Sequence, residues 1–493
     1  MCLAFTLLAT ANSGGYRYGI GDQAFYEPAT QLRLHPEFFP RDRDLLQSQA
    51  RLTVIDEALA SASRVTGLDL PQLFLALYLL TLVTVALAGA SLARALGFSR
   101  WATTAFLTLL TLRHRIAKTG ANTLEGYMHP RQLAFGVGVF ALAQSLRNRW
   151  ISTLALWLLA AAIHPTTAVW FGALIAGGAL VSKVQFVERQ YNLLFGLLVL
   201  VLVAGWQFGS TLLPAIHLPA SFIMDADWMS VFADKDYIFV SSWPAYAWVI
   251  NLAYLPLIAL IYSRRVRAGV QTPHEHRLLI GALVLFAGFA FSVFLSQGHL
   301  AFAVQLQVSR IFWLLDLIVT AYVAWWLTSD RAVTRITANA PQLALAIMLI
   351  LSVGRGIYTV TEGGPDRGLF RAALPDNDWS RAMQWLKTQP TDWLVLADPD
   401  HAWKYGTSVR VAASRDVVLE SVKDNSISMY GRDVAMRVAE RTTVLRSLTR
   451  GSTADVRAIA RSYGAAVFVT ESNQSLQLPK LYTNATFTVY DVR

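Results

Sequence analysis

The stretch Leu70–Ala93, LPQLFLALYLLTLVTVALAGASLA, carries no charged residue over a length that can cross a bilayer as an α-helix. Similar apolar blocks recur along the chain of 493 residues, which is 54% hydrophobic and only 15% charged, with a mean hydropathy of +0.41. This composition is too apolar for a soluble protein, and it excludes intrinsic disorder, collagen and disulfide scaffolds. We therefore expect a polytopic α-helical membrane protein.

Ten apolar blocks, together with the short apolar start Met1–Asn12, predict about 11 transmembrane helices. Several blocks are shorter than the roughly 17 residues that a span needs. Met1–Asn12 is about half a span, so either the first helix is short or the chain begins further upstream. The ten blocks are Leu70–Ala93, Trp101–Leu112, Gln132–Leu146, Trp150–Ile163, Thr166–Val181, Asn192–Leu213, Trp243–Ser263, Leu278–Ser296, Leu300–Leu327 and Leu343–Val353.

Lysines and arginines gather on every second loop between these blocks, which marks that side of the membrane as cytoplasmic. By the same alternation Gly14–Leu70, Pro214–Ser242 and everything after Val353 lie outside. The net charge of +10 is therefore a topology signal rather than the basic stripe of a nucleic-acid-binding protein, and we expect no nucleic acid partner. The basic residues are Arg94, Arg100, Arg147, Arg149, Lys183, Arg189, Arg264, Arg265, Arg267, Arg277, Arg331 and Arg335.

The composition changes after residue 353, where charges return and short β-branched runs alternate with helical stretches. The predicted domains are a transmembrane domain, 1–353, with a long first outer loop at 13–70, and a soluble α/β domain, 354–493, with a hinge at Gly363-Gly364-Pro365. These features suit a multi-pass protein of a bacterial inner membrane with an extracytoplasmic C-terminal domain. Trp393–Ala397, Val409–Val411, Val417–Leu419, Ala466–Thr470 and Phe487–Val492 predict strands, and Trp379–Thr388, Met436–Arg446 and Thr453–Tyr463 predict helices.

One loop breaks the charge rule. The segment 113–131, RHRIAKTGANTLEGYMHPR, falls on the outer side although it is basic. Polar, irregular backbone at membrane depth is tolerated where protein buries it or water fills a cavity, so we expect this loop to line one. Glu125, His129 and Arg131 occur together in it, and they predict either a substrate-binding wall or mutual salt bridges. A misplaced span boundary is the alternative explanation.

The first outer loop opens Gly15–Ala29, GYRYGIGDQAFYEPA. Asp22 lies about ten residues beyond the first apolar block, beside glycines that let backbone and ligand approach closely. A carboxylate held there could act as general base toward a hydroxyl. The alternative is an aspartate that caps a turn or a helix in a surface loop.

Two further sites carry unusual polar residues. Arg310 lies in the outer half of a long apolar block with Gln307 one turn before it, and an intramembrane arginine is costly unless it faces a cavity or a partner. We interpret it as a phosphate or lipid head-group ligand, or as half of a structural ion pair. His164, before Pro165, ends another block and predicts either phosphate binding and proton transfer or plain packing.

Metal binding is only weakly signalled, by the close carboxylates Asp42 and Asp44, Asp225 and Asp227, and Asp398 and Asp400 with His401. No metal ligands are predicted, and a divalent cation is the only cofactor that these pairs leave open. The chain lacks GxxxxGK[ST], HExxH, GxSxG and the dinucleotide-binding fingerprint, so soluble nucleotide chemistry is not expected.

The loop opening GYRYGIGDQAFYEPA and closing FFPRD, the many spans after it and the chain end LYTNATFTVYDV resemble the GT-C superfamily of membrane glycosyltransferases, in its poorly characterised bacterial members. The resemblance implies a polyprenyl-phosphate sugar or a diphosphate oligosaccharide from the bilayer as donor, and an inverting transfer to a glycan, lipid or protein acceptor. It implies that Asp22 is the catalytic base. Arg310, Arg131, His164, Glu125, His129 and Gln307 are the predicted substrate-binding residues.

Two other classes of function also fit the sequence. A transporter or flippase for a lipid-linked or polyanionic substrate would also line a path with charges, although no related halves are visible in the sequence. A non-catalytic partner in envelope-polysaccharide synthesis would keep the cavity without the chemistry. The nearest enzymatic rival, a ligase or polymerase of lipid-linked polysaccharide, would depend on an outer-loop histidine and arginines rather than on Asp22.

Overall fold

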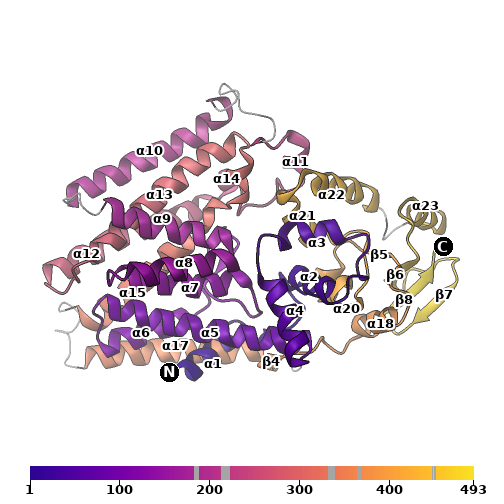
Figure 1. Cartoon of the computed structure of the whole chain (residues 1–493), viewed down its shortest axis with the longest axis horizontal. Coiled ribbons are helices and arrows are strands. Elements are labelled where there is room, and N and C mark those ends of the chain that lie inside the picture. The colour runs from indigo at the N-terminus through magenta and orange to yellow at the C-terminus, as the bar shows by residue number, and fades with distance from the viewer. Residues whose placement is uncertain (182–187, 213–221, 331–338, 363–367, 447, 449–450) are drawn as a thin grey trace. The chain divides into compact units, whose positions relative to one another are not determined.

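The computed structural model describes residues 1–181, 188–212, 222–330, 339–362, 368–446, 448 and 451–493 (Figure 1). The predictions for Lys183, Arg331, Arg335 and the hinge at Gly363-Gly364-Pro365 lie outside these residues. The chain divides into two compact units. The bundle unit comprises Met1–Tyr16, Leu77–Asp225 and Ala233–Leu369, and the α/β unit comprises Arg17–Ala76, Ala226–Phe232 and Phe370–Arg493. Most of the first outer loop therefore belongs to the same unit as the C-terminal region. This division differs from the predicted one, in which two consecutive domains meet at residue 353.

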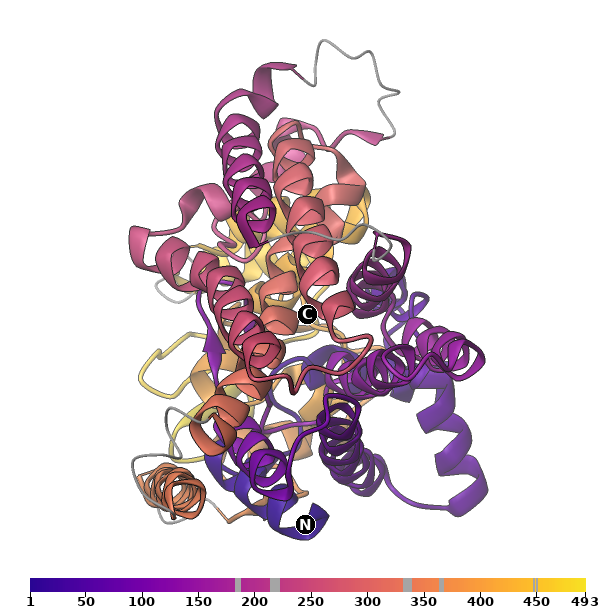
Figure 2. The same cartoon turned by 90° about the vertical axis from the view of Figure 1, so that its left-hand side faces the viewer.

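The bundle unit is helical. Five of the described helices are long and apolar enough to cross a membrane, namely Leu70–Ala95, Ala245–Arg267, His276–Gln297, Ala301–Ser329 and Ala340–Thr361, against the predicted total of about 11. Helices α6 and α17 lie side by side in Figure 1, and several helices of this unit are seen nearly end-on in Figure 2. The helices are α1 (Cys2–Asn12), α5 (Leu70–Ala95), α6 (Arg100–Thr111), α7 (Pro130–Ser145), α8 (Trp150–Ile163), α9 (Pro165–Val181), α10 (Glu188–Leu212), α12 (Ala245–Arg267), α13 (His276–Gln297), α14 (Ala301–Gln305), α15 (Ile311–Ser329) and α17 (Ala340–Thr361).

Small residues let these helices approach closely. A Cβ atom on Gly281 of α13 would lie 2.3 Å from the carbonyl oxygen of Leu174 in α9, and one on Gly178 would lie 2.4 Å from the carbonyl oxygen of Arg277. Helices in lipid gain little from the hydrophobic effect, so such close packing contributes much of their association. At the centre of the unit the rings of Phe135 in α7 and Trp313 in α15 stack with their centroids 4.0 Å apart.

The α/β unit contains a four-stranded sheet of order β5-β6-β8-β7. Strand β5 (Val395–Ala397) runs parallel to β6 (Val467–Glu471), whereas β6 pairs antiparallel with β8 (Phe487–Asp491) and β8 pairs antiparallel with β7 (Lys480–Thr483). Its helices are α2 (Gln23–Leu34), α3 (Arg43–Ala50), α4 (Ile55–Thr66), α11 (Ala226–Ser230), α18 (Asp378–Lys387), α19 (His401–Tyr405), α20 (Val409–Ala413), α21 (Ser421–Ile427), α22 (Arg432–Leu445) and α23 (Thr453–Tyr463).

Alternate residues of the sheet face two apolar layers. Val395 and Val467 pack with Trp379 of α18, whereas Leu396 and Phe468 pack on the other face with residues of α22 and α23. A sheet covered on both faces explains why β5 and β6 read as continuous apolar runs.

The α/β unit contains most of the strands and helices predicted for the C-terminal region. Three predicted strands and all three predicted helices are confirmed. The prediction of a strand at Val409–Val411 is wrong: these residues begin α20, whose first turn is capped by the Ser408 hydroxyl, which accepts a hydrogen bond from the Arg410 amide. Val417–Leu419 contributes a single parallel bridge between Val417 and Val395 instead of a strand.

Candidate functional site

A cavity of about 420 Å³ lies in the bundle unit beside the hairpin of β2 (Arg115–Ile116) and β3 (Ala121–Asn122). The first part of the predicted segment 113–131 lines this cavity, whereas Glu125, His129 and Arg131 are not among its lining residues. Four of the lining side chains are cationic and one is a carboxylate, so an anion is the ligand that the cavity favours. The lining residues are Arg113, Arg115, Ile116, Lys118, Gly120, Ala121, Asn122, Asp236 and Arg355.

Two of these cations, Arg115 and Lys118, belong to the hairpin, which reverses in a tight turn. Lys118 and Gly120 have φ angles of 61° and 62°, in the left-handed region that a short reversal requires. The buried side chain of Ile116 anchors β2. A Cβ atom on Gly120 would lie 3.1 Å from the Tyr237 ring, so the absence of a side chain lets this ring pack against the turn.

The charges of the cavity are only partly compensated. Lys118 pairs with Asp236 at 2.7 Å, and Nη1 of Arg355 donates to the carbonyl oxygen of Asn12 at 2.8 Å. The guanidinium of Arg115 makes neither a hydrogen bond nor an ion pair with any residue that the structure describes. A guanidinium binds phosphate through two parallel hydrogen bonds and stays charged, so Arg115 is suited to a phosphate ligand.

Glu125 and Arg131 form a buried pair behind this wall, with 4% and 3% of their surfaces exposed. Nη2 of Arg131 lies 3.3 Å from one carboxylate oxygen of Glu125, and Nη2 of Arg113 lies 3.3 Å from the other. Asn122 donates to the same carboxylate at 3.1 Å. The two predicted residues thus form a mutual salt bridge, and Glu125 connects that pair to Arg113 and Asn122 in the cavity wall.

His129 and His164 lie close to each other, and the centroids of their two rings are 6.4 Å apart. Nδ1 of His129 accepts a hydrogen bond from the amide of Arg131 and caps α7. Nδ1 of His164 accepts a hydrogen bond from the amide of Thr167 at 3.3 Å in the first turn of α9. An accepting Nδ1 implies that the proton of a neutral ring is on Nε2. Both histidines therefore stabilise helix ends.

Gln307 precedes the short 3-10 helix η4 (Val308–Arg310), and Arg310 is its last residue, directly before α15. The guanidinium of Arg310 lies 5.8 Å from the centroid of the Tyr237 ring, the same ring that packs on the cavity turn. Asp316, in α15, pairs with His114 at 3.1 Å. Arg310 thus contacts an aromatic residue that also packs against the hairpin.

Asp22 precedes α2 in the α/β unit, and its carboxylate makes no capping hydrogen bond to that helix. Its Oδ1 atom lies 2.5 Å from Nζ of Lys423 in α21. About a third of the Asp22 side chain is exposed, so solvent and ligands can reach it. The other six predicted site residues all belong to the bundle unit.

Sequence reasoning missed a buried ion cluster in the α/β unit. Asp42 is fully buried and accepts hydrogen bonds from Arg410 at 2.8 Å and from Arg437. Arg410 also forms a two-pronged pair with Asp424, at 2.6 and 3.0 Å. Although burial opposes ionisation, the two guanidinium groups hold the pKa of Asp42 below its usual value. The cluster joins the first outer loop to the sheet region, and no local pattern marks residues so far apart in the chain.

Two of the carboxylates that suggested metal binding have other partners. Asp42 is occupied by arginines, and Asp398 pairs with Lys404. Within the ranges that the structure describes, no group of three or more histidine, cysteine or acidic residues is arranged to hold a metal ion.

No protein-family profile and no curated protein matches the sequence. Among solved structures, the chain is similar to the Archaeoglobus fulgidus oligosaccharyltransferase in complex with zinc and sulfate. The TM-score is 0.39 at 13% sequence identity, over 95% of this chain and 67% of the other. A likeness at this level shows no function for this chain.

Proposed function

We propose that this chain is an integral membrane glycosyltransferase of the GT-C type, which takes a sugar from a polyprenyl-phosphate carrier and transfers it to an acceptor hydroxyl on the outer face of the membrane. The observation that carries the proposal is the cationic cavity in an apolar helical bundle, with the uncompensated guanidinium of Arg115 in its wall. A membrane-embedded lipid phosphate is a ligand that matches both the charge and the surroundings.

The cations would stabilise the departing phosphate, whose charge grows as the bond to the sugar breaks. Arg113 and Arg115 would bind its oxygens directly. Glu125 and Arg131 would hold Arg113 in place through the salt bridges described above. Arg310, Gln307, His129 and His164 would order the surrounding helix ends and extend the binding surface for the carrier.

Asp22 would be the general base. Its carboxylate would take the proton of the acceptor hydroxyl while the oxygen attacks the anomeric carbon on the face opposite the phosphate, so that the configuration inverts. The C–O bond to the phosphate breaks, and the phosphate leaves with that electron pair. The proposal requires the ammonium group of Lys423 to leave the Asp22 oxygen that accepts the proton.

Two other functions fit parts of the structure. A cationic cavity in a bundle also fits a transporter or flippase of a lipid-linked or polyanionic substrate. The Asp22–Lys423 pair fits a non-catalytic partner in which the carboxylate has a structural role. Neither alternative predicts that free polyprenyl phosphate is released in an Asp22-dependent reaction.

The test uses the full chain in lipid nanodiscs with a panel of radiolabelled polyprenyl-phosphate sugars and membrane extract as acceptor source. Release of polyprenyl phosphate is compared for the native chain, Asp22→Asn and the control Glu37→Gln, which removes an exposed carboxylate from the same loop. Release that requires Asp22 but not Glu37 supports the proposal. Donor binding without release from any donor would contradict it and favour the transporter or scaffold.

A further inference from the structure

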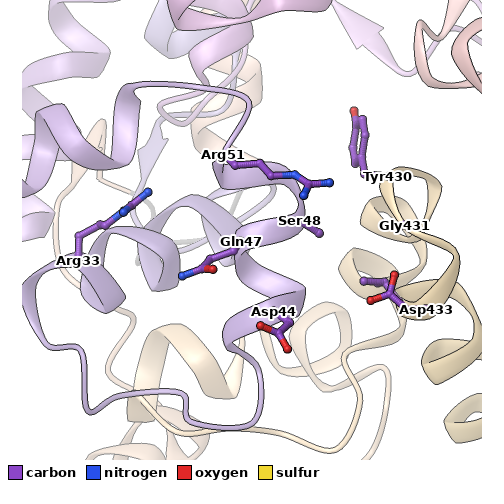
Figure 3. A pocket seen from close by; sticks show the side chains of 9 residues that line it. Arg33, Asp44, Gln47, Ser48, Arg51, Tyr430, Gly431 and Asp433 are labelled. Atoms are coloured by element: carbon purple, nitrogen blue, oxygen red, sulfur yellow. The ribbon is translucent and has the colours of Figure 1, made fainter.

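A second cavity, of about 380 Å³, lies within the α/β unit (Figure 3). One wall is α3 of the first outer loop, which contributes Asp44 and Gln47, together with Arg51 directly after its last residue. Tyr430 and Asp433, on the facing wall, come from the end of the 3-10 helix η5 (Ser428–Tyr430) and the first turn of α22. The two walls are distant in sequence, so the cavity exists only in the folded unit.

Four polar side chains of this cavity are exposed and face solvent instead of protein partners. Asp44, Gln47, Arg51 and Asp433 make no side-chain hydrogen bond or ion pair with any residue among the described ranges. In Figure 3 the side chains of Arg51, Gln47 and Asp44 follow one helix, and Asp433 lies on the helix across from it. They supply donors and acceptors together, because carboxylates accept, a guanidinium donates and an amide does both.

The charge balance narrows the ligand class. Two arginines, Arg33 and Arg51, and two aspartates, Asp44 and Asp433, line the cavity. Arg33 already pairs with Asp56 and Glu57, so the charges left for a ligand are one guanidinium and two carboxylates. An anion would meet the carboxylates and a cation would meet the guanidinium of Arg51. The polar lining disfavours an apolar ligand, whose burial would leave these groups without water or partners.

We infer that this cavity is a binding site for a neutral saccharide. The vicinal hydroxyl groups of a sugar donate to carboxylates and accept from guanidinium and amide groups, and they carry no charge. The Tyr430 ring offers an apolar surface to the C–H face of the sugar. That the bound saccharide is the acceptor glycan rests on the proposed function, whereas saccharide binding itself does not.

The experiment measures binding of neutral trisaccharides, built from glucose, mannose, galactose or N-acetylglucosamine, to the full chain in nanodiscs by saturation-transfer NMR and titration. No lipid donor is present, so the readout is independent of catalysis. The variants are Gln47→Ala and Asp433→Asn, whose side chains are exposed and unpaired, so folding is preserved. Gln477→Ala and Asp392→Asn are matched exposed controls in the same unit.

At least one neutral trisaccharide is expected to bind, and combining Gln47→Ala with Asp433→Asn weakens it by about tenfold or more while the controls do not. No binding of any neutral trisaccharide, equal binding by all variants, or a preference for anionic sugars would overturn the inference. Saccharide binding without sugar transfer would support the saccharide site in this cavity and contradict the proposed function. Sugar transfer with an unchanged acceptor KM in the double variant would show that the acceptor does not bind in this cavity, while the proposed function would stand.

Discussion

Lys423 and Asp22, 401 positions apart in sequence, meet with 2.5 Å between the ammonium nitrogen and Oδ1. The pair links the start of α2 in the first outer loop to α21 near the chain end. The predicted catalytic carboxylate is therefore paired with a residue of the C-terminal region within the α/β unit.

Removing each member of the pair separates a catalytic role from a structural one. The pair is partly exposed, so it contributes only about 0–1 kcal/mol to stability and neither variant should lower Tm much. If Asp22 is the base, Asp22→Asn should reduce sugar transfer by about 10²-fold or more, whereas Lys423→Met, which leaves the carboxylate, should keep most activity. Release of polyprenyl phosphate and differential scanning fluorimetry measure the two effects. Equal losses in both variants, with a lower Tm, would point to a structural pair.

Arg115→Gln should weaken binding of polyprenyl phosphate by about tenfold or more, because the amide removes a charge-assisted hydrogen bond. Affinity of the native chain should also decline more steeply with salt than affinity of the variant. Binding is measured by titration into nanodiscs at two salt concentrations. Arg149→Gln, at an exposed position before α8, is the matched control, and an equal effect there would show a general charge effect instead of a site.

Asp42→Asn should destabilise the α/β unit by about 3–5 kcal/mol, since it removes a charge that compensates the buried guanidinium of Arg410. The expected readouts are a lower Tm and faster proteolysis within residues 17–76, which the ion cluster joins to the sheet region. Asp392→Asn, at an exposed position, should change neither. An unchanged Tm for Asp42→Asn would show that water compensates Arg410.

Glu27 should make stability depend on pH. Its side chain is buried between Tyr18 and Gln31, and burial raises its pKa from 4.5 to about 7. The folded chain therefore holds this proton more tightly than the unfolded chain. The resulting stabilisation is complete below pH 4.5 and is lost as the pH rises through about 7.

Glu27→Gln keeps a neutral side chain of the same shape and should flatten this part of the pH profile. Thermal unfolding at pH 5 and pH 7.5 is the measurement, and the exposed Glu37→Gln serves as control. Parallel profiles for native chain and Glu27→Gln would show that Glu27 does not titrate in this range.

Local patterns predicted much of the secondary structure. Leu70–Ala93 became α5, and Thr453–Tyr463 became α23 with the same bounds, because a Ser452–Asp455 capping box and Gly464 fix its two ends. The strand predicted at Val409–Val411 is absent because Ser408 caps the start of a helix there. The β-branched composition of these residues does not indicate that helix.

The sequence by itself determined that the chain is apolar and helical, that its end is an α/β region, and that part of the basic segment 113–131 lines a cavity, because hydropathy and charge are local properties. Only the tertiary structure decided that the first outer loop joins the chain end, through Asp42 and Arg410, and that Lys423 binds Asp22. Pairing of distant charges depends on which surfaces fold together, and no periodicity in either segment specifies its partner.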